Sequence, residues 1–295
     1  MNGVPNISSS LLATTVPVDI GQYKQLSLTY DNQQNAMWLH MKSKPRPCFT
    51  PTLLHELDNV FSLINEHDET TTPIDYLVAA SGTPGIYSLG GDLHYFQECI
   101  ESQDKERLRK YGYACIDVSY QCAKQFDRNV TTIALVQGQA MGGGFEGALA
   151  CNIIIAEEDA TFGFPEILFN LFPGMGAHVY LSRRISPYAA QRMLSSGNQY
   201  TAQQMYDMGI VDVLVKKGEG VSATTDFIRR HRSRLLAHRA IYQANIRLNP
   251  VSIQELRDIN DIWVETAMQI SSHDLKTMAR LVRAQERLNN ARAAG

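Results

Sequence analysis

The chain has 295 residues, of which 44% are hydrophobic and 19% charged, so a disordered or collagen-like chain is excluded and one large or two ordinary domains are possible. Its formal net charge of −3 lacks the basic excess that nucleic-acid binding requires, and we expect no nucleic-acid partner.

The cysteines and the first residues indicate the compartment. Five cysteines, an odd number without a CxxC pair, disfavour both a disulfide framework and a zinc ribbon, so we expect a reducing, cytoplasmic setting and no metal site. Residues 1–20 contain no basic residue and no long apolar run, so they do not have the form of a signal peptide. No apolar stretch approaches the roughly 20 residues of a membrane-spanning helix.

The first elements follow a polar arm of residues 1–20, which has no periodicity. Two β-prone stretches over residues 22–31 and 36–42 are separated by "NQQN" and predict a hairpin. Residues 51–67 carry apolar side chains at helical spacing after a proline that a helix start tolerates. A short apolar strand is predicted in "IDYLVAASG", over residues 74–82.

A long amphipathic helix is predicted from Lys105 to Phe126, because apolar residues recur there every three or four positions. Its central cysteines, Cys115 and Cys122, are then core residues and not a redox pair. "TTIALVQG" and "NIIIAEE" are predicted strands, and "GGGFEGALAC" between them begins a helix. This alternation of strands and helices favours an α/β core.

The chain divides by pattern into three parts. We expect an arm over residues 1–20, an α/β core over residues 21–215 and a helical region over residues 216–295. In the last part, Ser252 and Glu255 have the spacing of a capping box that opens a helix.

The stretch "VQGQAMGGGFE" is the most informative, because it combines four glycines with the carboxylate of Glu146. A first interpretation is a nucleotide-binding loop, because "GGGFEG" formally satisfies the GxGxxG motif and Glu166 lies near the spacing of the acid that binds the ribose in dinucleotide-binding folds. Two features disfavour nucleotide binding: "GQAM" separates the preceding strand from the glycines, and Glu166 follows loop-like sequence instead of the end of a strand. A purely structural role, in which glycines let a helix pack closely on a strand, leaves Glu146 unexplained because burying an acid is costly.

A third interpretation is chemical. Glycine at a helix N-terminus leaves a backbone N–H free to bind an anion that forms during a reaction, and the helix dipole reinforces it. One donor rarely suffices, and Gly90 and Gly91 in "YSLGGDL" are candidates for the second. Taken alone, that loop could equally be a plain turn before a helix.

These two glycine loops and two glutamates together resemble the crotonase (enoyl-CoA hydratase/isomerase) superfamily over about residues 74–215. The matching blocks are "GIYSLGGDL" and "VQGQAMGGGFEGALACNIIIAEEDATFGFPEILFNLFPGMGA". The resemblance implies an α/β fold of repeated ββα units with a C-terminal helical region. It also implies that the N–H groups of Gly91 and Gly143 bind a thioester carbonyl as it becomes an enolate, without a cofactor.

Two acids are typical of the hydratases of this superfamily, and here they correspond to Glu146 and to Glu166 in "FGFPE". Retaining both favours hydration or dehydration over isomerisation, since one carboxylate can remove the α-proton while the other protonates the departing 3-hydroxyl. Their proton affinities would have to differ, which burial and mutual repulsion can achieve. His94 has no accompanying nucleophile, and we expect it near the surface.

Over most of the chain the sequence is more similar to the diffusible signal factor synthases than to ordinary hydratases, as in "GGGFEGALA" and "FPGMGAHVYLSRRISP". That resemblance implies dehydration of a 3-hydroxyacyl carrier-protein thioester to the cis-2-enoyl thioester, followed by hydrolysis to a free signalling acid. Substrate contacts are expected from residues that could equally be core packing. They are Gly90, Gly142, Met175, Trp263 and Leu281.

The implied partners are an acyl carrier protein or coenzyme A thioester of a 3-hydroxy fatty acid, and a regulatory protein. Basic clusters at residues 42–47, 183–184 and 229–234 could meet an acidic carrier protein or could be ordinary solvated faces. The superfamily implies a homotrimer or hexamer formed through the C-terminal helices. Two other functions stay open, a conventional enoyl-CoA hydratase of fatty-acid catabolism and a noncatalytic binding protein on the same fold.

Overall fold

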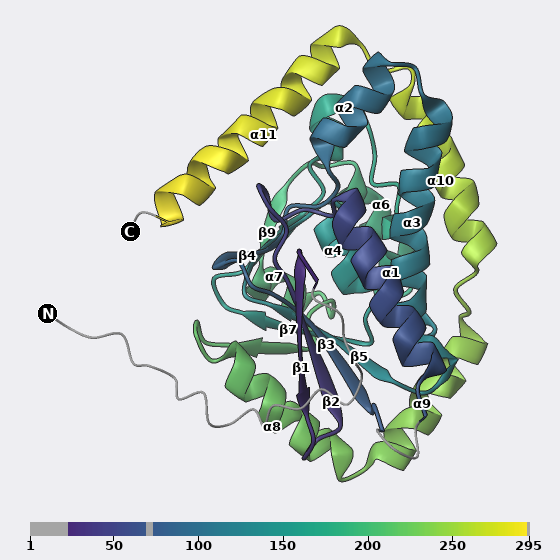
Figure 1. The fold of residues 1–295 in the computed structure, drawn as a ribbon, viewed down its shortest axis with the longest axis vertical. Helices are drawn as coiled ribbons and strands as arrows, with labels where there is room; N and C mark the ends of the chain where they lie inside the picture. Colours follow the sequence, from purple (N-terminus) through teal and green to yellow (C-terminus); the bar gives the residue numbers. More distant parts are fainter. Residues whose placement is uncertain (1–22, 69–72, 294–295) are drawn as a thin grey trace, which may run out of the picture.

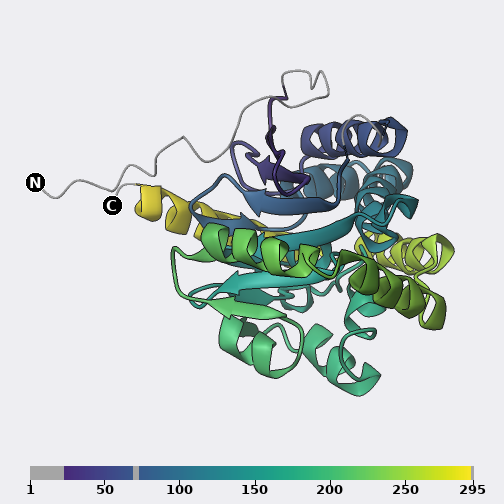
Figure 2. The same ribbon diagram turned by 90° about the horizontal axis from the view of Figure 1, so that it is seen from below.

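The computed structural model describes residues 23–68 and 73–293, with side chains up to residue 284. The expected arm lies outside these residues. Two β-sheets form the centre, and helices pack around them (Figure 1; Figure 2). Within the described part of the chain, we find no helix with the length and apolar character needed to cross a membrane.

The first sheet has six strands in the order β1-β2-β3-β5-β7-β10, and only β1 runs antiparallel to its neighbour. These strands are β1 (Leu26–Asp31), β2 (Ala36–Met41), β3 (Tyr76–Ser81), β5 (Thr131–Val136), β7 (Ile153–Glu157) and β10 (Val213–Val215). The predicted hairpin of β1 and β2 is confirmed. Every residue of β5 and β7 is buried, as parallel strands covered on both faces require.

The second sheet has four short strands in the order β4-β6-β8-β9. They are β4 (Gly85–Ser88), β6 (Gly138–Met141), β8 (Thr161–Gly163) and β9 (Gln199–Thr201). The first three each follow a strand of the large sheet along the chain and precede a helix. The repeated ββα arrangement is thereby confirmed, and "GQAM", predicted as a connection, is the strand β6.

The helices lie on both sides of the large sheet. They are α1 (Pro51–Glu66), α2 (Leu93–Glu101), α3 (Lys105–Ala123), α4 (Gly143–Leu149), α5 (Ala177–Leu181), α6 (Pro187–Leu194), α7 (Ala202–Asp207), α8 (Gly220–Arg232), α9 (Leu235–Leu248), α10 (Ile253–Ala267) and α11 (Ser272–Ala293), with 3-10 turns η1 (Gln125–Asp127) and η2 (Glu166–Phe169). The helix predicted to reach Phe126 ends at Ala123, because Phe126 adopts a positive φ of 57° in η1.

Helix α3 packs between α1 and α10 (Figure 1). A Cβ atom on Gly112 of α3 would lie 2.4 Å from the side-chain amide of Asn260 on α10, so this glycine permits the close approach of the two helices. Of the predicted capping box of α10 only the N-cap half is confirmed: the Ser252 hydroxyl accepts hydrogen bonds from the N–H groups of Gln254 and Glu255, whereas the Glu255 carboxylate pairs with Arg183. Trp263, on the buried face of α10, packs against the ring of Phe96 on α2.

Candidate active site

The two glycine loops are in contact with each other. Gly142 joins β6 to α4 with φ 50° and ψ −126°, a conformation that glycine adopts without strain. A Cβ on Gly90 would lie 2.9 Å from the nitrogen of Gly143, and a Cβ on Gly143 would lie 3.3 Å from the nitrogen of Gly91. The backbone therefore brings together the two N–H groups, of Gly91 and Gly143, that the sequence proposed as anion donors.

The first loop is held by contacts that the sequence did not predict. The N–H of Phe49 donates to the Gly90 carbonyl at 2.8 Å. The N–H of Asp92 donates to the Tyr111 hydroxyl at 3.0 Å, and that hydroxyl donates to the Phe49 carbonyl. Arg46 forms a 2.8 Å ion pair with Asp92, and the Arg46 side chain is only 8% exposed. Arg46 is thus a structural residue and not part of a solvated basic cluster.

Glu146 lies on α4 and is 1% exposed. Its Oε1 accepts hydrogen bonds from the N–H groups of Met175 at 2.8 Å and Ala177 at 2.9 Å, while its buried Oε2 has no partner. Burial raises the pKa of Glu146 to about 7, against the opposing effect of the two backbone N–H groups. This carboxyl can therefore exchange a proton near neutral pH.

Glu166 is the first residue of η2 and faces the glycine turn. A Cβ on Gly142 would lie 2.4 Å from Glu166 Oε1, so only glycine at position 142 lets this carboxylate approach. Burial, followed by the charge of Glu146, raises the pKa of Glu166 to about 8. Two neighbouring acids with raised proton affinity can hold one proton between them, as acid–base catalysis requires.

Both acids line one cavity, which we call the outer cavity. It also includes almost every residue that the sequence predicted for the site. These residues are Gly91, Gly142, Gly143, Glu146, Glu166, Met175, Trp263 and Leu281. Gly90 is not in its lining, because it packs beneath the turn, against the Met141 carbonyl and the Gly143 nitrogen. His94 is exposed, as predicted.

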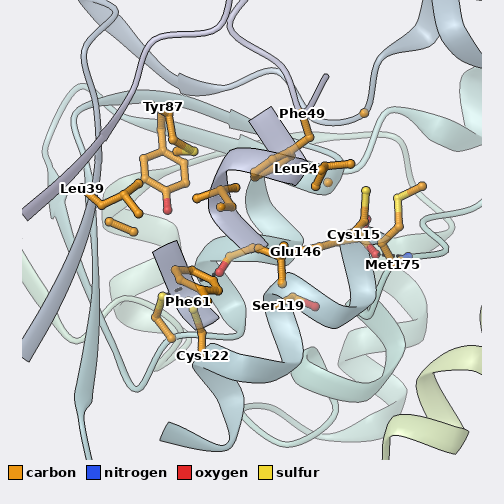
Figure 3. A pocket seen from close by; sticks show the side chains of 18 residues that line it. Leu39, Phe49, Leu54, Phe61, Tyr87, Cys115, Ser119, Cys122, Glu146 and Met175 are labelled. Atoms are coloured by element: carbon orange, nitrogen blue, oxygen red, sulfur yellow. Dashed lines mark hydrogen bonds between the residues drawn. The ribbon is translucent and has the colours of Figure 1, made fainter. Parts of the chain in front are cut away.

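A second cavity, the inner chamber, also has Glu146 in its lining (Figure 3). It is lined by Leu39, Met41, Phe49, Leu54, Leu57, Phe61, Ala79, Tyr87, Gly91, Cys115, Val118, Ser119, Cys122, Gly143, Glu146, Gly147, Cys151 and Met175. Neither the inner chamber nor most of these side chains was predicted, although the helical spacing of Cys115 and Cys122 placed both in the interior. Within the described residues, no group of three or more His, Cys, Asp or Glu side chains could hold a metal ion.

The fold is shared with known structures. The chain is similar to an enoyl-CoA hydratase from Bacillus halodurans, with a TM-score of 0.73, 19% identity and coverage of 87% of this chain and 99% of that one. It is also similar to Pseudomonas aeruginosa DspI, with a TM-score of 0.60, 24% identity and coverage of 82% and 85%.

Curated relatives are similar in sequence. A 2,3-dehydroadipyl-CoA hydratase from Escherichia coli is 30% identical over 55% of this chain and 61% of its own length. A probable mitochondrial enoyl-CoA hydratase from Arabidopsis thaliana is 28% identical over 57% of this chain and 52% of its own length. The matched region thus spans little more than half the length of these relatives. Residues 32–258 match the family model of enoyl-CoA hydratase/isomerase. Because this match covers more than half of the chain, the protein belongs to the enoyl-CoA hydratase/isomerase family.

Proposed function

We propose that the protein dehydrates a 3-hydroxyacyl thioester to the cis-2-enoyl thioester and then hydrolyses it to a free unsaturated acid that serves as a diffusible signal. Family membership supports the coarser activity, hydration or dehydration of an enoyl thioester. The observation that carries the proposal is the pair of acids, the buried Glu146 and the half-buried Glu166, beside the N–H groups of Gly91 and Gly143.

In the dehydration step, the two N–H groups bind the thioester oxygen as negative charge develops on it. One glutamate removes a proton from C2, and the resulting enolate expels the 3-hydroxyl, which the other glutamate protonates to give water. The step needs one ionised and one protonated carboxyl. The raised pKa values of about 7 for Glu146 and about 8 for Glu166 provide that combination near neutral pH.

The hydrolysis step can use the same donors, because the tetrahedral intermediate carries its charge on the same oxygen. A glutamate accepts a proton from water as the water oxygen adds to the carbonyl carbon. The C–S bond then breaks, and the thiol leaves with a proton. No second nucleophile is required.

The deciding experiment uses 3-hydroxydodecanoyl thioesters of acyl carrier protein and of coenzyme A, with products identified by mass spectrometry and by double-bond geometry. We expect cis-2-dodecenoic acid, with faster release from the carrier protein. Trans-enoyl-CoA without free acid would contradict the synthase and support the conventional enoyl-CoA hydratase, which the curated relatives favour.

The roles of the acids are tested by Glu146→Gln and Glu166→Gln, each of which should lower turnover by about 10²- to 10⁴-fold. His94→Gln is the matched control, since His94 is exposed on α2. Unchanged turnover in both glutamine variants would contradict the mechanism and favour a noncatalytic binding protein.

We further propose a homotrimer or hexamer formed through the C-terminal helices, and docking by the carrier protein or a regulatory protein. Helix α9 has no buried residue, and its Leu236 and Leu248 are 86% and 85% exposed, which suits burial against another subunit. Light scattering of the purified protein measures the oligomeric state, and a monomer would contradict this part of the proposal.

A further inference from the structure

The peptide unit that carries the Gly91 N–H is bound through its other polar group. A trans peptide is planar, so its C=O and N–H groups point in opposite directions. The carbonyl of this unit belongs to Gly90 and accepts a hydrogen bond from the Phe49 N–H at 2.8 Å. Among the described residues, no group accepts from the Gly91 N–H. Because Gly91 lines both cavities, this N–H is free to bind a ligand.

The next peptide unit is held by Tyr111, a side chain of α3. The Tyr111 hydroxyl accepts from the Asp92 N–H at 3.0 Å and donates to the Phe49 carbonyl. One oxygen thus joins the two backbone segments of the isolated parallel bridge between Phe49 and Gly91. Tyr111 is 4% exposed, so water has little access to these bonds. Burial also raises the pKa of Tyr111, which keeps the donated proton on the hydroxyl.

Aromatic contacts fix the ring of Tyr111. Its centroid lies 5.1 Å from that of Tyr95 and 5.2 Å from that of Phe96, and both of these residues belong to α2. A Cβ on Gly91 would lie 2.4 Å from the Phe96 ring, so this ring also packs against the glycine loop. The Tyr111 hydroxyl therefore has a defined position relative to Gly91.

Gly91 needs an external restraint, because glycine has few steric limits on its backbone angles. Gly90 precedes it with a φ of 92°, so two permissive residues follow each other directly. The hydrogen bonds to Phe49 and Tyr111 hold the peptide units before and after Gly91. They thereby set the direction of the N–H group that the proposed function assigns to the thioester oxygen.

We propose that Tyr111 is a positioning residue of the reaction, whose hydroxyl holds the Gly91 N–H in the direction of the thioester oxygen. The inference rests on the proposed function, because it takes this N–H as one of the two donors. A hydrogen bond weakens when its donor turns away from the acceptor, and a preorganised donor acts mainly on the charge of the transition state. Loss of the hydroxyl should therefore affect kcat more than KM.

The first test is Tyr111→Phe, which removes the hydroxyl and keeps the aromatic ring, so we expect the variant to fold, as checked by circular dichroism. With 3-hydroxydodecanoyl-CoA, kcat should fall by about 10- to 100-fold, less than the loss of a whole donor would cause. KM should change by less than about threefold. The matched control is Tyr30→Phe, because the buried Tyr30 hydroxyl donates to the Pro73 carbonyl and Tyr30 lines neither cavity. This control should retain the wild-type kcat.

An infrared measurement shows whether the hydroxyl acts through the N–H donor. The probe is a dodecanoyl-CoA analogue in which CH₂ replaces the thioester sulfur, so that it can be neither dehydrated nor hydrolysed. Its ketone band moves to lower frequency when the carbonyl oxygen accepts hydrogen bonds. We expect this lowering in the wild-type protein and in Tyr30→Phe, and a smaller lowering in Tyr111→Phe. A reduced kcat with an unchanged band would mean a merely structural role and would overturn the proposal, as would an unchanged kcat.

The infrared band also separates this inference from the proposed function, because it requires no turnover. If Tyr111→Phe diminishes the lowering of the band although no thioester is turned over, the positioning of the Gly91 N–H holds and the proposed function fails. If thioesters are turned over but Tyr111→Phe changes neither kcat nor the band, the inference fails and the proposed function holds.

Discussion

Replacing Glu146 by glutamine should stabilise the protein, and increasingly so as the pH rises. Burial raises the pKa of Glu146 from 4.5 to about 7, so the folded state binds its proton more tightly than the unfolded state does. The wild-type protein therefore loses stability as the pH rises from the unfolded pKa through the folded one. Glutamine keeps the oxygen that accepts from the N–H groups of Met175 and Ala177 and never ionises.

The size of the effect follows from the pKa. Each tenfold change in proton affinity corresponds to about 1.4 kcal/mol, so the ionised Glu146 carboxyl destabilises the folded state by about 3 kcal/mol at alkaline pH. Between about pH 5.5 and about pH 8.5, the stability difference between Glu146→Gln and wild type should grow by about 2 kcal/mol. Removal of the Glu146 charge also lowers the pKa of Glu166, because that charge is one of its two raising causes.

The measurement is the free energy of unfolding in urea at several pH values, for wild type, Glu146→Gln and the surface control Glu101→Gln, whose side chain is exposed. We expect the stability difference to rise with pH only for Glu146→Gln. A difference that is independent of pH, or that falls as the pH rises, would refute the reasoning. The same variant should be nearly inactive, so stability and turnover move in opposite directions.

Three further substitutions test the surroundings of the site. Gly142→Ala places a Cβ 2.4 Å from Glu166 Oε1, and we expect kcat to fall at least about 100-fold with retained folding, as measured by circular dichroism; unaltered kcat would contradict this role. Arg46→Met leaves the mostly buried Asp92 without its ion-pair partner and should lower the free energy of unfolding, measured in urea, by about 3 kcal/mol. A loss of stability no larger than that expected for an exposed ion pair would contradict the structural role of Arg46. Ser252→Ala removes the cap of α10 and should lower the free energy of unfolding by about 1 kcal/mol without changing kcat. A variant as stable as the wild-type protein would show that the cap does not contribute to stability.

The long elements could be predicted from the sequence because their periodicity extends over many residues. The helix α1 carries apolar residues at helical spacing, and the strand β5 ends in an apolar run and is buried at every residue. The strands of the second sheet have only three or four residues, too few for a period to be recognised. For this reason "GQAM" was predicted as a connection, although it pairs with β4 and β8.

The site could be predicted only where its chemistry lies in side chains or in glycines. Glu146 could be identified because an acid in apolar, glycine-rich sequence needs an explanation, and Glu166 because "FGFPE" resembles a motif of the superfamily. The N–H groups of Met175 and Ala177 that bind Glu146 could not, because a backbone donor has no signature in the residue type. Arg46 was missed for another reason, since only the three-dimensional structure shows that its partner is Asp92.

The glycines of the run have different roles, and the structure assigns different interpretations of the sequence to different glycines. Gly144 has a structural role, because a Cβ there would lie 2.4 Å from the Ser88 carbonyl oxygen and prevent α4 from packing on β4. Gly142 and Gly143 instead face the site, towards Glu166 and the nitrogen of Gly91. A nucleotide phosphate at this turn would meet two carboxyl groups and no cation among the lining residues of the outer cavity, and like charges repel in a buried site. An uncharged thioester carbonyl, which gains negative charge only during the reaction, avoids that repulsion when it binds and benefits from the N–H groups when the charge appears.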